Sequence, residues 1–188
     1  MKKTIYSFFI VAIILLGVSF TAHSQTGATN SKIYRQAVTT DPGTLIMHDR
    51  FNVKYEQSIS RKNSFTADLM YNWNYNTEKY TNVGITLGAG YRWYFHNIFP
   101  EIRTRGIEGL AVGPLANINY VRWKVNDDNS NNRLGIDVGI EAVYKFVLFE
   151  ALAIEPALRL GWGIPITEFG EYNKDFQLWP GVSIGYAW

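Results

Sequence analysis

The sequence predicts an all-β fold, an eight-stranded antiparallel up-and-down transmembrane β-barrel. Apolar residues recur at every second position along most of the chain, which is the period of a β-strand with one apolar face. The composition agrees, because 15% aromatic residues with only 18% charged residues is unusual for a soluble domain. The length of 188 residues suits a single domain.

The composition also excludes several classes of function. Without Lys2 and Lys3, which lie in a segment that we expect to be removed, 16 basic residues balance 16 acidic ones. No basic excess then remains for binding nucleic acid. The chain has no cysteine, which excludes disulfides, thiolate metal sites, cysteine catalysis and lipoprotein anchoring.

Residues 1–24 have the pattern of a secretory signal peptide, with a positive start, an apolar run over residues 5–20, and small residues at Ala22 and Ser24. We expect cleavage before Gln25 and export through the Sec pathway. The alternative is an uncleaved anchor, but the apolar run is shorter than the roughly 20 residues that a spanning helix needs. Beyond the leader, the sequence predicts a flexible lead-in at 25–31 and the barrel at 32–188.

The first barrel strand is weak and is followed by a turn signal at Asp41-Pro42-Gly43. Polar loops are expected at 126–133 and 165–175, and the connection at 96–108 could be helical. Arg122 and Lys124 fall on the apolar register of their strand, so either the strand leaves the membrane there or a bulge switches its faces. The strands are predicted at residues 32–39, 45–59, 64–76, 83–95, 109–124, 134–149, 152–164 and 176–188.

Alternation alone does not say which face of the barrel is apolar, and a lipocalin-like protein would bury its apolar face inside. The apolar stripe at 134–148 would rise roughly 35 Å at about 3.4 Å per residue and a tilt near 40°, which matches a bilayer. Glycine gains nothing on a solvent-facing strand but makes room in a narrow lumen. Ten glycines share the polar face: Gly84, Gly88, Gly90, Gly113, Gly135, Gly139, Gly161, Gly163, Gly181 and Gly185.

The aromatic residues of the apolar face fall into two groups, as expected of rings at two membrane interfaces. One group belongs near the outer rim: Trp73, Tyr75, Tyr120, Trp162 and Phe176. The other belongs near the inner rim: Tyr55, Phe65, Tyr91, Trp93, Phe95, Tyr144, Phe146, Tyr186 and Trp188. These observations predict that the polar face points into the lumen.

The last strand ends on an aromatic residue, with apolar residues at alternate positions before it: Val182, Ile184, Tyr186 and Trp188. This ending resembles the C-terminal assembly signal of bacterial outer-membrane barrels, which implies recognition by the outer-membrane assembly machinery. The alternative is an ordinary half-buried terminal strand.

Three further stretches carry a family resemblance: YEQSISRKNSFTADLMYN, then GYRWYF, and later GLAVGP. They resemble the small outer-membrane β-barrel proteins of unknown function that are common in Bacteroidota, which are similar to the OmpX/OmpW/OmpA-type eight-stranded barrels. The resemblance covers most of the mature chain. It implies the barrel fold and a location in the outer membrane of a Gram-negative bacterium, and it brings no catalytic motif.

Ten charged residues fall on the polar face, five of each sign. One hypothesis is a lumen plugged by an ion-pair network, because unpaired charges in so narrow a space would each cost several kcal/mol. The alternative is a polar conduit or proton relay. The predicted network is Arg50, Lys54, Glu56, Asp68, Arg92, Asp137, Glu141, Lys145, Glu155 and Arg159.

Evidence for catalysis or a cofactor is weak. His48 and His96 are the histidines left after export, and no spaced serine or carboxylate motif accompanies them, although Glu168 and Glu171 lie in an outer loop. Asp127 and Asp128 lack the glycine and distal glutamate of a calcium loop. We find no metal-ligand spacing, nucleophile elbow or phosphate loop, so no catalytic, metal or cofactor site is expected.

The sequence therefore predicts an integral outer-membrane β-barrel with a structural or interaction role and a closed lumen. It is expected to be a monomer, not an enzyme, whose partners are outer-membrane lipids and the assembly machinery rather than nucleic acid. One alternative is a narrow channel for small solutes. The second is an outer-membrane lipid-modifying enzyme.

Overall fold

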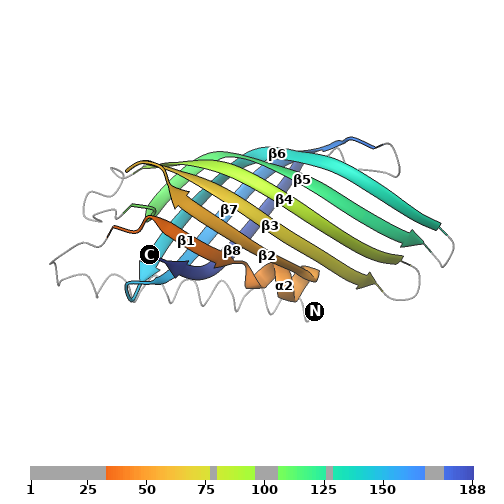
Figure 1. The fold of residues 1–188 in the computed structure, drawn as a ribbon, viewed down its shortest axis with the longest axis horizontal. Coiled ribbons are helices and arrows are strands. Elements are labelled where there is room, and N and C mark those ends of the chain that lie inside the picture. Colours follow the sequence, from red (N-terminus) through yellow and green to blue (C-terminus); the bar gives the residue numbers. More distant parts are fainter. Residues whose placement is uncertain (1–32, 77–79, 96–105, 126–128, 168–175) are drawn as a thin grey trace. The chain divides into compact units, whose positions relative to one another are not determined.

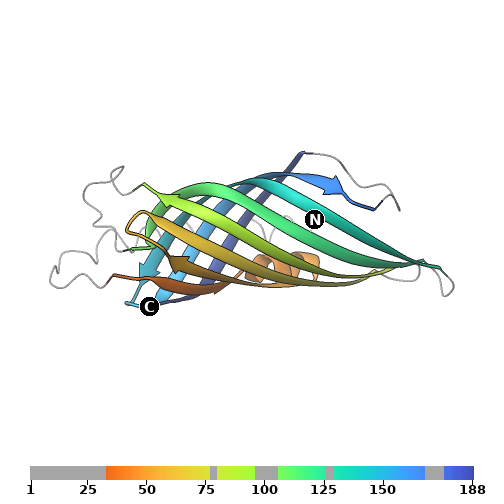
Figure 2. The same ribbon diagram turned by 45° about the horizontal axis from the view of Figure 1, so that its top comes forward.

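The computed structural model describes residues 33–76, 80–95, 106–125, 129–167 and 176–188. The expected signal peptide at 1–24, the lead-in at 25–31 and most of the connection at 96–108 lie outside the described residues. Within them the chain forms one closed barrel in which every strand pairs antiparallel with its sequence neighbours (Figures 1 and 2). The strands are β1 (Gln36–Thr40), β2 (Arg50–Ser58), β3 (Asn63–Asn76), β4 (Tyr80–Tyr94), β5 (Gly109–Val125), β6 (Asn129–Leu148), β7 (Leu152–Pro165) and β8 (Phe176–Ala187).

The barrel closes where the first strand meets the last. Val38 of β1 is the register partner of Tyr186 of β8. The C-terminal residue contributes to this closure, because the Trp188 carbonyl accepts hydrogen bonds from the Arg35 and Gln36 amides, at 2.9 and 3.0 Å. The predicted eight-stranded antiparallel barrel is therefore confirmed.

The two ends of the barrel differ. We call one the terminal end, because β1 starts there and the chain stops there at Trp188; it also holds the short turns at 59–62 and 149–151 and the connection from β4 to β5. The 149–151 turn uses left-handed backbone at Phe149 and Glu150. The opposite end, which we call the loop end, holds the connections β1–β2, β3–β4, β5–β6 and β7–β8.

The polar face of the sheet points inward, as predicted. Lys54, Arg92 and Glu155 are 1%, 0% and 0% exposed, whereas apolar residues on the other face remain about half exposed, such as Leu87 at 57% and Ile118 at 53%. This is the reverse of a soluble barrel, in which the apolar face fills the interior. The lipocalin-like alternative is therefore wrong.

Two glycines of the inward face, Gly88 and Gly161, make room for neighbouring side chains. A Cβ on Gly88 would lie 2.2 Å from the Asn117 Oδ1 and 3.1 Å from the Asp68 Cβ. A Cβ on Gly161 would lie 3.0 Å from the Trp179 ring. Asn117 and Trp179 therefore occupy the space that a side chain at Gly88 or Gly161 would take.

The strand predicted at 45–59 is wrong in its first third, because a short helix α2 (Pro42–His48) precedes β2. Asp41 caps this helix by accepting hydrogen bonds from the Gly43 and Thr44 amides, and Pro42 suits the first helical turn. Left-handed backbone at Asp49 ends the helix. Asp41-Pro42-Gly43, which the sequence predicts to be a turn, is therefore the start of a helix.

Other boundaries also differ from the predictions. The first strand is Gln36–Thr40 rather than 32–39, and β4 begins at Tyr80 rather than 83. The polar run at 126–133 is predicted to be a loop, but Asn129–Arg133 extends β6, with Val125 opposite Asn129. The β5–β6 register runs to that point without an inserted residue, so the alternative of a bulge at Arg122 is wrong. The Arg122 side chain is exposed on the outward face of β5.

Candidate functional site

The lumen half nearest the terminal end holds a cluster of buried charges centred on Arg92 of β4. Its guanidinium donates to three carboxylates on three other strands: Glu56 at 2.6 Å, Glu141 at 2.6 Å, and both oxygens of Glu155 at 2.9 Å. Charge-assisted pairs of this forked geometry are among the strongest hydrogen bonds in proteins.

Two lysines complete the buried cluster. Lys54 Nζ donates to Glu155 at 3.1 Å and lies 3.6 Å from Glu141. Lys145 Nζ contacts Glu56 and lies 3.1 Å from Glu155. Three buried cations thus face three buried carboxylates, which offsets the desolvation cost of each.

The Glu56 carboxylate also accepts hydrogen bonds from two neutral side chains. The hydroxyls of Ser64 and Tyr94 each donate to its Oε1 at 2.5 Å. Sequence reasoning missed both residues because it considered charged side chains alone. The alternation of the strands could have found both residues. Tyr94 shares the inward face of β4 with Arg92, and Ser64 shares the inward face of β3 with Thr66.

An apolar layer lies at the same end of the barrel. Its buried members include Tyr34, Ile107, Ala111, Val143 and Ala187. The segments before β1 and before β5 meet here, through a bridge between Tyr34 and Gly106 and a 3.1 Å hydrogen bond from the Ile107 amide to the Tyr34 carbonyl. Gly106 has φ +75°, and a Cβ there would lie 1.9 Å from the Tyr34 carbonyl oxygen, so the contact requires glycine.

The predicted network does not form a single cluster. Lys54, Glu56, Arg92, Glu141, Lys145 and Glu155 are brought together, and Arg159 joins at the edge through a 3.3 Å bond from Nε to Glu141. Arg50, Asp68 and Asp137 lie apart from it. The buried Arg50 Nε and Asp68 Oδ1 have no hydrogen-bond partner within the described part of the chain.

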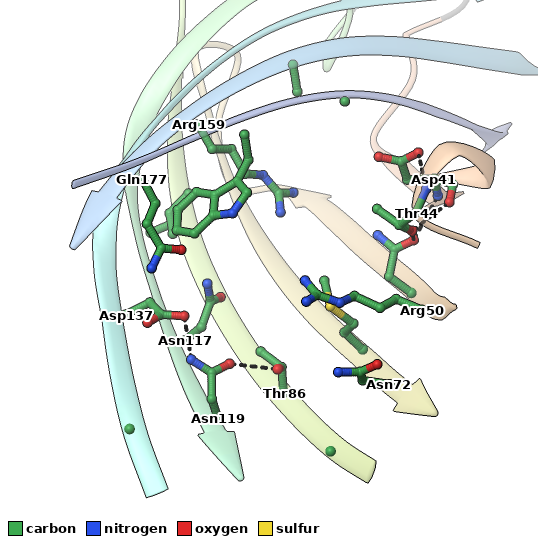
Figure 3. A pocket seen from close by; sticks show the side chains of 18 of the residues that line it. Asp41, Thr44, Arg50, Asn72, Thr86, Asn117, Asn119, Asp137, Arg159 and Gln177 are labelled. Carbon is green, nitrogen blue, oxygen red and sulfur yellow. Dashed lines mark hydrogen bonds between the residues drawn. The ribbon is translucent and has the colours of Figure 1, made fainter. Parts of the chain in front are cut away.

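The lumen half toward the loop end contains a cavity of about 600 Å³ that is lined by both polar and apolar residues. Its walls carry amides, hydroxyls and arginines from most of the strands, and Asp41 and Thr44 from the start of α2 (Figure 3). One wall is a hydrogen-bonded ladder across β4, β5 and β6: Thr86 donates to Asn119 at 2.6 Å, and Asn119 donates to Asp137. Arg159 belongs both to the cavity wall and to the cluster, so the cluster forms the floor of the cavity.

Aromatic rings gather on the outward face in two groups. Toward the terminal end, ring centroids of Tyr91–Trp93, Tyr144–Phe146 and Tyr186–Trp188 lie 5.0, 4.4 and 5.7 Å apart. Toward the loop end, Tyr71–Trp73 and Trp162–Phe176 lie 5.7 and 5.2 Å apart. The band between them is apolar and contains Leu69, Leu87, Ile118, Ile140, Leu158 and Leu160.

The residues of the predicted assembly signal lie on this outward face of β8. Ile184, Tyr186 and Trp188 are 41%, 55% and 41% exposed, and Val182 is partly exposed. They alternate with the inward residue Ser183, which is buried beside the cluster. The ending is therefore part of the barrel wall.

The weaker chemistry candidates find no support in the described residues. The side chain of His48 and the whole of His96, Asp127, Asp128, Glu168 and Glu171 lie outside them. The part of the chain that is described contains no group of three potential metal ligands. Nor does that part contain a helix long and apolar enough to cross a membrane.

Comparison with known proteins gives a family and resemblances to solved structures. The family described as "Protein of unknown function (DUF3575)" matches residues 10–176. The N-terminal β-barrel domain of Pseudomonas aeruginosa OprF is similar at 12% identity and a TM-score of 0.48, over 85% of this chain and 98% of that one. Neisserial surface protein A (NspA) is similar at 12% identity and a TM-score of 0.42, over 82% of this chain and 92% of that one. No curated protein matches the chain.

Proposed function

This chain belongs to the DUF3575 family of proteins of unknown function, and we propose that it is an integral outer-membrane β-barrel protein with a closed lumen and a structural or interaction role. The observation that carries the proposal is the reversed polarity of the barrel. Charged side chains are buried in its interior, while large apolar side chains cover its outside. A continuous apolar exterior of this kind is unfavourable in water and suits a lipid environment.

The dimensions of the exterior support the same proposal. From Phe65 near the terminal end to Trp73 near the loop end, β3 rises about 21 Å at about 3.4 Å per residue and a tilt near 40°. The outward apolar band of a transmembrane barrel is about 25 Å tall and is flanked by aromatic residues at both interfaces. The pairing of β1 with β8, from Ala37–Ala187 to Thr40–Ile184, also satisfies backbone groups that would otherwise be unpaired at a sheet edge in the hydrocarbon region.

A closed lumen is supported by two layers at the terminal end. The apolar layer around Tyr34 and Ile107 lies beside the ion-pair cluster, in which Arg92, Lys145 and Glu155 are fully buried. A solute crossing the barrel would have to break these contacts and leave buried charges uncompensated. This favours the structural or interaction role over the narrow channel.

The remaining features follow as part of the proposal. The terminal end, where Trp188 lies, would face the periplasm, and the loop end would face outward. The leader at 1–24 would direct export through the Sec pathway, and the last strand would be read by the assembly machinery. The mature protein would be a monomer in contact with outer-membrane lipids, without a catalytic activity.

Fractionation of cells that produce the full chain tests this proposal. We expect the protein in the outer-membrane fraction, starting at Gln25, with a folded band that shifts on boiling before denaturing electrophoresis. Recovery as a soluble periplasmic protein, or with Met1 intact, would contradict it. A matched variant in which Ala22 and Ser24 are both changed to Asp should block processing and leave the precursor in the inner membrane.

A further inference from the structure

Arg50, the first residue of β2, stands apart from the other charges of the lumen. Its side chain lines the cavity at the loop end of the lumen (Figure 3). Within the described residues it forms no ion pair, and its buried Nε has no hydrogen-bond partner. A partly buried guanidinium without a counter-charge is unfavourable, because desolvation is not offset by an opposite charge.

The register partner of Arg50 also has an unsatisfied polar atom. Asn72 is its register partner on β3, and its buried Oδ1 also lacks a hydrogen-bond partner within the described residues. The acidic residues of the cavity are engaged elsewhere: Asp41 caps α2, and Asp137 accepts a hydrogen bond from Asn119. Neither forms an ion pair with Arg50.

A second arginine points at the same space. Arg159 donates its Nε to Glu141, and its guanidinium and that of Arg50 approach the middle of the cavity from different strands (Figure 3). Arg133 lines the cavity as well, so the described residues of its walls carry three arginines and only two carboxylates, those of Asp41 and Asp137. The cavity centre is therefore flanked by two arginines, and the cations of the cavity wall outnumber its carboxylates.

We propose that this cavity binds a small organic anion, with its carboxylate or phosphate group held by Arg50. Arginine presents a planar fork of donors that matches both groups, and nearby amides such as Asn72 and Asn117 offer further hydrogen bonds. A volume of about 600 Å³ is within the roughly 300–1,000 Å³ of small-molecule sites. Because the ion-pair cluster closes the cavity on the side of the terminal end, the ligand would be bound there and would not pass through the barrel.

The site goes beyond the proposed outer-membrane role and is tested separately from it. Isothermal titration calorimetry on the folded full-length barrel in detergent would use three probes: succinate, inorganic phosphate and the neutral sugar maltose. Binding of succinate or phosphate is expected, weakened about tenfold or more in Arg50→Gln and by high salt. The matched control is Arg122→Gln, which removes an exposed arginine from the outward face of β5 and should leave affinity unchanged.

A second readout keeps the test informative if affinity is low. Without ligand, Arg50→Gln should unfold at a higher temperature than the unmodified protein, since it removes an uncompensated charge, whereas Arg122→Gln should not. No binding of succinate or phosphate at about 10 mM together with an unchanged or lower unfolding temperature of Arg50→Gln would overturn the proposal. So would binding of maltose alone, or equal weakening by the two variants. Loss of the barrel fold in every sample would instead contradict the proposed function.

Discussion

Arg92 and Glu155 form a two-pronged ion pair across the lumen from β4 to β7, with both N–O distances at 2.9 Å. Both side chains are fully buried. The two strands are not neighbours in the barrel, so the pair ties opposite walls together. Arg92 also bonds to Glu56 on β2 and Glu141 on β6, so the cluster links four strands across the terminal half of the lumen.

Replacement of Arg92 by alanine should therefore destabilise the barrel strongly. The change leaves three buried carboxylates with reduced compensation, and breaking a buried pair from one side costs about 3–5 kcal/mol. The free energy of unfolding, measured by denaturant titration in lipid vesicles, is expected to fall by that amount. Arg122→Ala is the control, because this exposed side chain should be within about 0.5 kcal/mol of neutral. Equal effects of the two changes would contradict a structural role of the cluster.

The closed lumen has a direct electrical consequence. Unmodified protein reconstituted in planar bilayers should show no steady conductance, because the ion-pair cluster and the apolar layer around Ile107 fill the terminal half. Insertion must be verified on the same sample by protease protection. A stable open pore from correctly folded protein would replace the structural role by the channel alternative.

Removal of Trp188 should impair assembly in cells. This residue lies on the outward face, and its carbonyl and amide take part in the closure with β1. We expect less folded protein in the outer membrane, measured by the heat-shifted band. The control is Trp162→Phe, an outward aromatic residue far from the chain end, which should assemble normally. An unchanged yield of the Trp188 deletion would show that the terminal aromatic residue is not an assembly signal.

The alternation of the sequence predicts much of this fold for a physical reason. Period two determines which residues share a face, so the sequence alone places Lys54 and Arg92 inward and Leu87 outward. Glycines such as Gly88 then indicate a crowded interior. The helix at Pro42–His48 escapes prediction because its first residues, with Asp41 before them, suit both a turn and a helix start. The polar run at Asn129–Arg133 suggests a loop, although a strand can continue beyond the apolar band.

The pairing inside the lumen could not be predicted from the sequence. Lys54 has Asp68 as its register partner on the next strand, yet its Nζ bonds to Glu155 across the barrel. That choice depends on the diameter and stagger of the closed barrel, which alternation does not determine. For the same reason, the separation of Arg50 from the cluster and the cavity beside it emerge only in three dimensions.

The most direct test of the account is the depth dependence of arginine substitutions on the outward face. Leu158, 44% exposed, lies midway between the two aromatic groups, whereas Ile164, 50% exposed, lies beyond Trp162 toward the loop end. If this face contacts lipid, Leu158→Arg should lower the free energy of unfolding in vesicles by about 2–4 kcal/mol and Ile164→Arg by only about 0–1 kcal/mol. Equal and small effects of both substitutions would mean that the face contacts water, which would contradict the transmembrane assignment.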